Sequence, residues 1–444
     1  MKLLNNYISS LSETKRKIFL NVFWALLGKV VNMLGILLVG ILIARYLGPE
    51  QFGLMNYVIS YVTLFSVLAG FGLENIEIRE LSREPERKNS ILGTAFLIRL
   101  FFAMVAVIAI GITLCIFRPD TETTILIAIY SLTVFTGCFN VIRNYFTSIV
   151  KNEYVVKSEI ARTLIGAAIK IALLWFGFPL IYFIIALVLD PVLVASGYVI
   201  AYNRKVGKIG EWRYERKMVS YLVKESFPLL LSGAAMIVYQ RIDQVMIGNM
   251  IDDQSVGYFA AAARFTDVIL VLPLILVQTV TPILVRIKKE DPARYEEKKL
   301  QFISIVVWGA VIISLLISVT AYWLIACTYG VKYMAAIPVL QIIAWKTVGM
   351  ALSASSGQII IMEGLQKWDF VRNILACAIC VGLNLLLIPV YGVVGSAWVT
   401  IITILFTSYL SNIFIPAYHR IMRTQSKALL WGWKEIYHIK DFIK

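Results

Sequence analysis

Ten charged residues lie inside long apolar stretches of this sequence, and seven of them are basic. If those stretches cross a lipid bilayer, a charge at its centre costs at least about 2.5–3.5 kcal/mol, so these side chains must face water, the protein interior or each other. Because the bases outnumber the acids, a cavity that they line would suit an anionic cargo such as a phosphate or pyrophosphate. The residues are Lys29, Arg99, Arg143, Lys170, Arg241, Arg264 and Lys346, together with Asp190, Asp243 and Asp267.

We assign candidate roles within this set. Two structural alternatives stay open: some of the cations could reach a membrane interface, and the charges near residues 241–267 could neutralise each other in structural pairs. We interpret Arg143 as an interfacial anchor at the cytoplasmic end of its helix. The candidate substrate-binding residues of a cationic lumen are Lys29, Arg241, Arg264, Lys346, Arg99 and Lys170. The candidates for ion coupling or charge pairing are Asp243, Asp267 and Asp190.

Helical spacing constrains which of these charges can meet. At ~100° per residue, Arg241 and Asp243 point about 200° apart on one helix, so each must find its partner on a different helix. Arg264 and Asp267 are three residues apart and can touch each other.

The composition requires that lipid be the solvent of this chain. Hydrophobic residues make up 59% of the 444 residues, charged residues 16%, and the mean hydropathy is +0.78. Soluble domains are about 45–50% apolar and about 25% charged. The sequence therefore predicts an all-α integral membrane protein.

Apolar runs long enough to cross ~30 Å of hydrocarbon recur along the whole chain and predict about twelve transmembrane helices. We expect a six-helix lobe over 1–202, a cytoplasmic linker over 203–225, a second six-helix lobe over 226–417 and a cytoplasmic amphipathic tail over 418–444. The predicted helices are 18–44, 52–73, 91–117, 124–148, 160–176, 181–202, 226–249, 256–286, 300–326, 337–362, 370–389 and 392–417.

Lysine and arginine in the loops predict the orientation. With the N-terminus in the cytoplasm, nearly all loop cations fall on the cytoplasmic side, and only Arg45, Arg118 and Lys332 fall on the other. This is the asymmetry of the positive-inside rule, and it places both termini in the cytoplasm. Most of the net charge of +15 is then an orientation signal, so we expect no nucleic-acid partner.

The two halves carry a weak internal repeat. Residues 45–53 follow the first helix as 249–257 follow the seventh, and Gly53 matches Gly257 at the same place. Both halves begin in the cytoplasm, so an axis along the membrane normal relates them. Two six-helix lobes of this kind are typical of an alternating-access carrier.

Other chemistry is absent from the sequence. It has no phosphate-binding G-x-x-x-x-G-K-[ST] motif, and its two histidines, His419 and His438, lie in the tail. We interpret Cys377 and Cys380, a C-x-x-C in mid-helix, as apolar filler rather than as a metal or redox site. The external loops are too short to hold a catalytic domain, so we expect no enzyme activity, no cofactor and no metal.

Three stretches resemble one known family. They are Ala-Arg-Tyr-Leu-Gly-Pro-Glu-Gln-Phe-Gly at 44–53, Arg-Ile-Asp-Gln-Val-Met-Ile-Gly at 241–248, and Val-Gly-Tyr-Phe-Ala-Ala-Ala-Ala-Arg at 256–264. With the end of the eighth helix at 282–286, they resemble polysaccharide transporters and O-antigen flippases of the Wzx type. These belong to the multidrug/oligosaccharidyl-lipid/polysaccharide (MOP) flippase superfamily, and the resemblance spans the whole chain.

The resemblance implies a function. A polyprenyl-pyrophosphate-linked oligosaccharide, the repeat unit of O-antigen in lipopolysaccharide or of another surface polysaccharide, would move from the cytoplasmic to the periplasmic leaflet of a bacterial inner membrane. Alternating access, a proton or sodium ion as coupling ion, and other polysaccharide-assembly membrane proteins as partners are implied as well. Two alternatives stay open: an ion-coupled multidrug or small-molecule exporter, and a peptidoglycan lipid-precursor flippase. The latter usually has fourteen helices.

Overall fold

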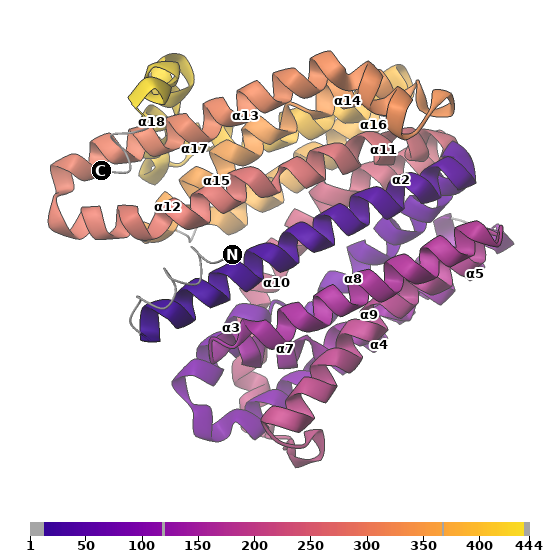
Figure 1. Ribbon diagram of the computed structural model, residues 1–444, viewed down its shortest axis with the longest axis horizontal. Coiled ribbons are helices and arrows are strands. Elements are labelled where there is room, and N and C mark those ends of the chain that lie inside the picture. The colour runs from indigo at the N-terminus through magenta and orange to yellow at the C-terminus, as the bar shows by residue number, and fades with distance from the viewer. Residues whose placement is uncertain (1–12, 118–119, 366–367, 439–444) are drawn as a thin grey trace, which may run out of the picture. The chain divides into compact units, whose positions relative to one another are not determined.

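The computed structural model describes residues 13–117, 120–365 and 368–438, and every regular element among them is a helix (Figure 1). Each of the twelve predicted segments is helical. The chain divides into two compact units, which we call the N-unit (1–43 and 61–234) and the C-unit (44–60 and 235–444). Two long helices contribute to both units, α2 (Glu13–Gly70) and α10 (Arg216–Met250).

The remaining elements belong to one unit each. The N-unit holds α3 (Glu74–Arg83), η1 (Pro85–Arg87), α4 (Lys88–Phe117), α5 (Thr121–Ser131), α6 (Thr133–Thr136), η2 (Gly137–Phe139), α7 (Asn140–Ser148), α8 (Asn152–Trp175), α9 (Leu180–Lys205) and η3 (Ile209–Glu211). The C-unit holds α11 (Asp253–Ile269), α12 (Val271–Glu290), α13 (Pro292–Thr328), η4 (Val331–Tyr333), α14 (Ala336–Ile343), α15 (Lys346–Met362), α16 (Asp369–Leu405), η6 (Phe406–Leu410), α17 (Ser411–Phe414), η7 (Pro416–Tyr418), α18 (His419–Trp431) and η8 (Gly432–His438).

Eight helical stretches of the described chain are long and apolar enough to cross a membrane. Two of them, of 47 and 46 residues, are more than twice as long as the ~20 residues that one crossing needs. Each contains a glycine in the left-handed region, Gly48 (φ 76°) and Gly392 (φ 58°), where the helix direction changes. Glycine fits these two kinks because it lacks the Cβ that makes positive φ costly. Each stretch therefore includes parts of two predicted segments.

Four predicted helices are interrupted, and one of them, 392–417, is divided among α16, η6, α17 and η7. The segment 124–148 is divided among α5, α6, η2 and α7, and 337–362 is divided between α14 and α15. The segment 256–286 breaks at Leu270, between α11 and α12. Pro273 follows this break. A proline inside a helix has no backbone N–H to donate, and its ring clashes with the carbonyl four residues earlier, so the helix is weakened there.

The predicted linker is packed against the N-unit. The backbone N–H of Arg213 donates to the carbonyl oxygen of Asn89 at 3.0 Å, and the backbone N–H of Glu215 donates to Thr94 Oγ1 at 3.0 Å. Helix α10 then continues from this linker into the C-unit, so the boundary between the compact units lies at residue 234. The segment 44–60 of α2 likewise belongs to the C-unit, although it precedes most of the N-unit in sequence.

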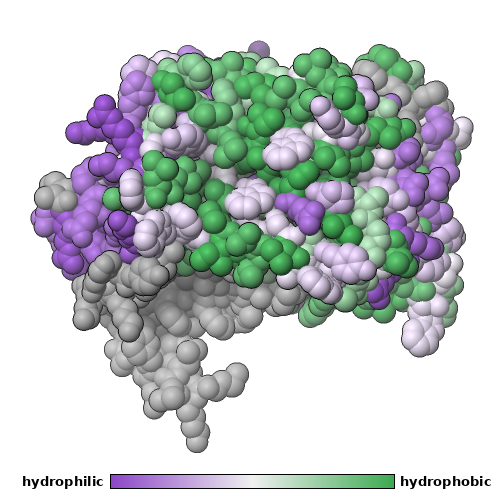
Figure 2. Space-filling view, turned by 90° about the horizontal axis from the view of Figure 1, so that it is seen from above, coloured by the Kyte–Doolittle hydropathy of each residue, from purple (hydrophilic) through white to green (hydrophobic). Residues whose placement is uncertain are grey.

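Each unit has its own apolar core. In the N-unit, α8 packs along α9 and α3 packs on α7; in the C-unit, α13 packs on α12, α14, α15 and α18 (Figure 1). The outer surface is also apolar: Leu316, Val319 and Trp323 of α13 are more than half exposed. Figure 2 shows hydrophobic side chains over the middle of one face and hydrophilic ones toward its left and right edges. With the eight candidate spans, this surface identifies a multi-pass membrane protein.

The tail is helical as far as it is described. One face of α18 is buried through Ile421, Gln425 and Ala428, and the carbonyl of Ala428 accepts a hydrogen bond from Trp308 Nε1 of α13 at 3.0 Å. Tyr418 anchors its start, because the phenol is buried and donates to the carbonyl of Leu365 at 3.0 Å. The last six residues of the predicted tail, 439–444, lie outside the described residues.

Candidate functional site

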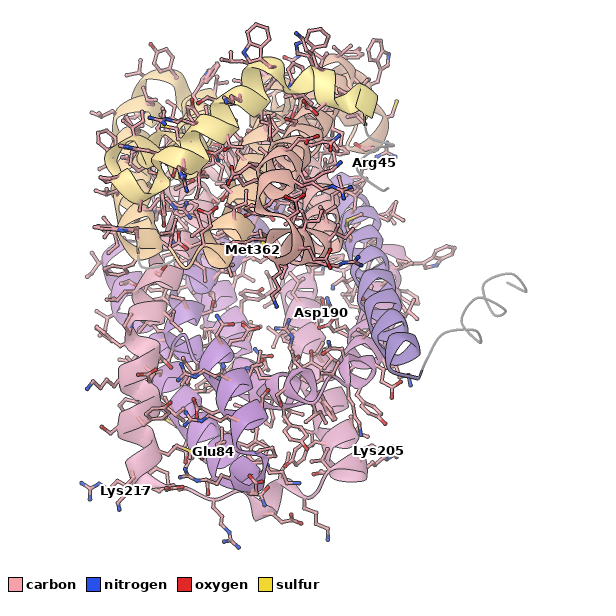
Figure 3. All side chains as sticks on the ribbon, turned by 90° about the vertical axis from the view of Figure 1, so that its left-hand side faces the viewer. Arg45, Glu84, Asp190, Lys205, Lys217 and Met362 are labelled. Atoms are coloured by element: carbon pink, nitrogen blue, oxygen red, sulfur yellow. The ribbon has the colours of Figure 1, made fainter. Side chains whose placement is uncertain are left out.

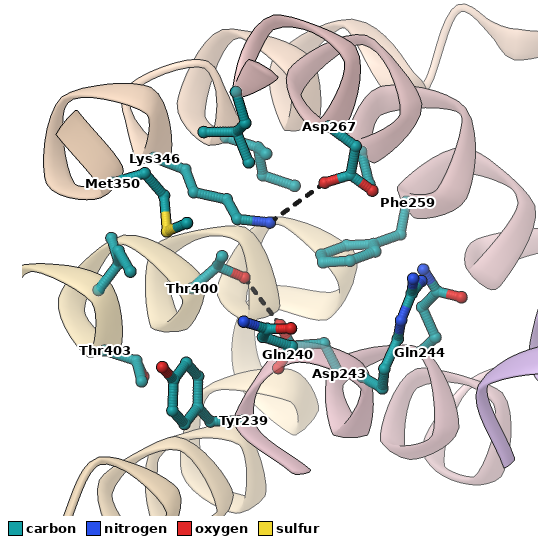
Figure 4. Close-up of a pocket in the computed structure, with 15 residues that line it drawn as sticks. Tyr239, Gln240, Asp243, Gln244, Phe259, Asp267, Lys346, Met350, Thr400 and Thr403 are labelled. Atoms are coloured by element: carbon teal, nitrogen blue, oxygen red, sulfur yellow. Dashed lines mark hydrogen bonds and ion pairs between the residues drawn. The ribbon is translucent and has the colours of Figure 1, made fainter. Parts of the chain in front are cut away.

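A cavity of about 200 Å³ lies within the C-unit, among α10, α11, α14, α15 and α16 (Figure 4). Apolar side chains such as Phe259, Leu270 and Met350 form part of its wall. The polar and charged side chains of its wall are Tyr239, Gln240, Arg241, Asp243, Gln244, Asp267, Lys346, Thr400 and Thr403. Four of the sequence-predicted site residues therefore line one cavity.

Asp243 is the most buried charge of this cavity, with 3% of its surface exposed. Its Oδ1 accepts hydrogen bonds from Asn384 Nδ2 at 2.6 Å and from Cys380 Sγ at 3.5 Å, and its Oδ2 accepts one from Thr400 Oγ1 at 2.8 Å. Among the described residues no lysine or arginine forms an ion pair with it. A buried carboxylate whose hydrogen-bond donors are all neutral has no counter-charge. A mobile cation that binds beside it can supply that charge.

The second charged pair of the cavity is more open. Lys346 Nζ on α15 lies 3.4 Å from Asp267 Oδ1 on α11 (Figure 4). The Asp267 side chain is 48% exposed and that of Lys346 is 18% exposed. A partly solvated pair at this distance contributes little to stability, about 0–1 kcal/mol. Lys346 can therefore leave Asp267 and donate hydrogen bonds to a ligand with little loss of stability.

The two arginines of α10 and α11 lie in different surroundings. Arg241 lines the cavity together with Asp243, although helical spacing puts the two about 200° apart; its long side chain can reach around the helix. Arg264 stands over the ring of Phe52, 5.3 Å from the centroid, beside the aromatic cluster that includes Tyr329 and Tyr333. Asp267, which the spacing allows Arg264 to contact, forms an ion pair with Lys346.

In the N-unit the predicted charges form buried pairs. Arg99 Nε lies 2.8 Å from Glu77 Oε1, with 4% and 0% of the two side chains exposed, and Asn144 Nδ2 donates to Glu77 Oε2 at 2.5 Å. Lys170 Nζ pairs with Asp190 Oδ2, and both side chains are nearly buried. In Figure 3 the Asp190 side chain points into the interior, whereas Lys205 and Lys217 reach outward.

Arg143 lies 3.4 Å from Glu74 in an exposed pair, and its role as an interfacial anchor stays a prediction. The side chain of Lys29 lies outside the described residues.

The sequence reasoning missed Glu77, because it lies between two predicted spans. The signal was present in its neighbours: Leu73, Ile76 and Leu81 are apolar, recur at helical spacing and are buried in the same core. It also missed Asn384 and Thr400, because uncharged polar residues are common in membrane helices and do not stand out as site residues.

The comparisons with known proteins agree with this architecture. The model of the family described as polysaccharide biosynthesis protein matches residues 18–288, more than half of the chain. The chain belongs to that family. No curated protein matches it.

Solved structures share the fold across nearly the full length. An inward-facing multidrug resistance MATE family transporter of the MOP superfamily is 18% identical, covers 92% of this chain and 96% of its own, and has a TM-score of 0.64. The lipid II flippase MurJ, in an inward closed conformation, is 14% identical, with coverages of 94% and 96% and a TM-score of 0.64. A MOP superfamily transporter from Pyrococcus furiosus is 16% identical, with coverages of 95% and 96% and a TM-score of 0.54. The fold is therefore that of MOP transporters.

Proposed function

We propose that this protein is a flippase for a polyprenyl-pyrophosphate-linked oligosaccharide, such as the repeat unit of O-antigen or another surface polysaccharide. It would carry this cargo from the cytoplasmic to the periplasmic leaflet of a bacterial inner membrane by alternating access. Membership of a polysaccharide biosynthesis family supports this cargo class, and the MOP transporter fold supports transport.

The observation that carries the proposal is the charged cavity of the C-unit. Lys346 and Arg241 place two cations in its wall, in a unit whose outer surface is apolar. Pyrophosphate offers only acceptor oxygens and negative charge, so it is recognised by cations with several donors. Because Asp267 only partly neutralises Lys346, the cavity can exchange that contact for a contact with cargo.

Asp243 supplies the proposed site for a coupling ion, a proton or a sodium ion. A small hard cation prefers oxygen ligands, and the carboxylate of Asp243 lies beside the hydroxyl of Thr400 and the amide of Asn384, whose Oδ1 is buried and has no hydrogen-bond partner. Rotation of that amide would turn its oxygen toward the same point. Binding of a cation there would neutralise the one fully buried acid of the cavity.

The test is complementation of a flippase-null bacterial strain that carries this protein's own polysaccharide locus, with lipid-linked intermediates quantified. We expect surface polysaccharide to return and the intermediates at the cytoplasmic face to fall. Intermediates that stay trapped while the protein is inserted and folded would contradict the proposal. An efflux assay would then test the export of small molecules.

A further inference from the structure

A second cavity, of about 430 Å³, lies within the N-unit, and Asp190 is the one charge discussed above that lines it. It is formed by α9, by the end of α2 and by the interrupted helix α5–α6–η2–α7. Its volume falls in the range of about 300–1,000 Å³ that is usual for small-molecule sites. The polar and charged residues of its wall are Thr63, Ser66, Tyr130, Thr133, Thr136, Asn140, Arg162, Asp190 and Tyr198.

The hydroxyl groups of this wall present acceptors. Ser66 Oγ donates to the carbonyl of Thr63 at 2.7 Å, Thr133 Oγ1 to the carbonyl of Tyr130 at 2.7 Å, and Thr136 Oγ1 to the carbonyl of Thr133 at 2.6 Å. A hydroxyl has one proton and two lone pairs. Each of these groups already donates its proton, and its oxygen can still accept a hydrogen bond. A ligand that fits them must supply hydrogen-bond donors.

The acid of this wall is already neutralised. Asp190 is 9% exposed, and its Oδ2 is paired with Lys170, which stands outside the cavity lining. Its Oδ1 lies against α8 at Gly166, where a Cβ would stand 2.2 Å from this oxygen, so the glycine makes room for the pair. Because the carboxylate has its counter-charge, it neither requires nor attracts a cationic ligand.

We infer that this cavity binds an uncharged sugar ring, a hexose or N-acetylhexosamine, of the transported oligosaccharide, an inference that rests on the proposed flippase function. Sugar hydroxyls donate to the oxygens of Ser66, Thr133 and Thr136. Arg162 supplies a donor for a ring, glycosidic or acetamido oxygen, and the faces of Tyr130 and Tyr198 supply apolar surface for the C–H bonds of the ring. Pyrophosphate has no proton to donate at neutral pH, so it cannot form hydrogen bonds to the oxygens of Ser66, Thr133 and Thr136 as a sugar hydroxyl can.

The interrupted helix explains how the wall is assembled. Thr133, Thr136 and Asn140 are spaced by three and four residues, which puts them on one face of a helical segment. Thr133 and Thr136 donate their hydroxyl protons within their own helix, so this face offers a ligand their remaining lone pairs and the amide of Asn140. The adjoining cavity leaves space for the ligand.

The test is binding of methyl glycosides of neutral hexoses and N-acetylhexosamines to the purified full-length protein, measured by saturation-transfer NMR. The double variant T133V/T136V keeps side-chain shape and removes both acceptors. We expect it to weaken glycoside binding at least tenfold. T133S/T136S retains both hydroxyls, and we expect it to bind as the wild type does. Thr320→Val is the matched control, because Thr320 in the C-unit donates to its own helix carbonyl in the same way.

The outcomes separate this inference from the proposed function. Glycoside binding that is unchanged in T133V/T136V would overturn the sugar site. Absence of glycoside binding to a wild-type protein that restores surface polysaccharide would also overturn the sugar site and leave the flippase proposal standing. Glycoside binding that depends on Thr133 and Thr136 in a protein that does not restore polysaccharide would support the sugar site and contradict the flippase proposal.

Discussion

Gly53 and Gly257 form a reciprocal close contact between the two segments that the sequence repeat pairs. A Cβ on Gly53 would stand 1.6 Å from the carbonyl oxygen of Asp253, and a Cβ on Gly257 would stand 2.0 Å from the carbonyl oxygen of Pro49. Each glycine thus packs on the backbone that precedes the other. Around this contact Tyr57 donates to Asn249 Oδ1 at 2.9 Å and Ser60 to Gln244 Oε1 at 2.7 Å. The segment 44–60 is held in the C-unit by these contacts.

Substitution of either glycine by alanine should therefore destabilise the C-unit. The clash is with backbone, which cannot move aside as a flexible side chain can, so we expect a loss of about 1–3 kcal/mol for Gly257→Ala. Thermal unfolding in detergent measures it. Gly309→Ala is the control, because a Cβ on Gly309 meets nothing within 4 Å. Equal melting temperatures for the two variants would contradict the contact.

Glu77→Ala should destabilise the N-unit strongly. It leaves Arg99 buried without its counter-charge and Asn144 without its acceptor, and breaking such a pair from one side costs about 3–5 kcal/mol. Arg87→Ala is a suitable control, since the side chain of Arg87 is 47% exposed in its ion pair with Glu84. Thermal unfolding and the yield of folded protein measure both variants. A Glu77→Ala protein as stable as Arg87→Ala would show that the buried pair contributes nothing.

Asp243→Asn should abolish ion coupling and leave the protein folded. The amide keeps the size of the carboxylate and removes its charge, so a cation loses its main ligand while burial becomes less costly. We expect transport to fall at least tenfold and any stabilisation by sodium ions, or any dependence of transport on the proton gradient, to disappear. Asp267→Asn, at the half-exposed acid of the same cavity, is the comparison for ion dependence alone, which we expect it to retain. Unchanged ion dependence in Asp243→Asn would exclude this residue as the coupling site.

Lys346→Met should weaken the binding of polyprenyl pyrophosphate. A hydrogen bond to a charged group contributes about 1.5–3 kcal/mol, which corresponds to roughly tenfold or more in affinity. Combining it with Arg241→Gln should weaken binding further, because both cations line one cavity. Lys332→Met changes an exposed lysine of the same unit outside that cavity and should have no effect. Equal affinities for Lys346→Met and Lys332→Met would remove Lys346 from the binding site.

The twelve helical segments and the charges within them were predictable from the amino-acid sequence. Hydropathy is a local property, and a run of about twenty apolar residues has few alternatives to a membrane helix. The match of Gly53 with Gly257 was visible as a weak repeat, and both lie at the contact between the two segments. The interruption of 124–148 at Leu132 was not visible, because no proline or charge marks that position.

The partners of the charges were decided by the tertiary structure. Spacing along one helix allowed Arg264 to contact Asp267, and the packing of α11 beside α15 brings Lys346 to that acid. Asn384 and Thr400 meet Asp243 across more than 140 residues of chain, and Glu77 meets Arg99 and Asn144 from a predicted loop. Such pairs depend on how each helix is rotated about its axis against its neighbours, and a local pattern of residues contains no information about that rotation.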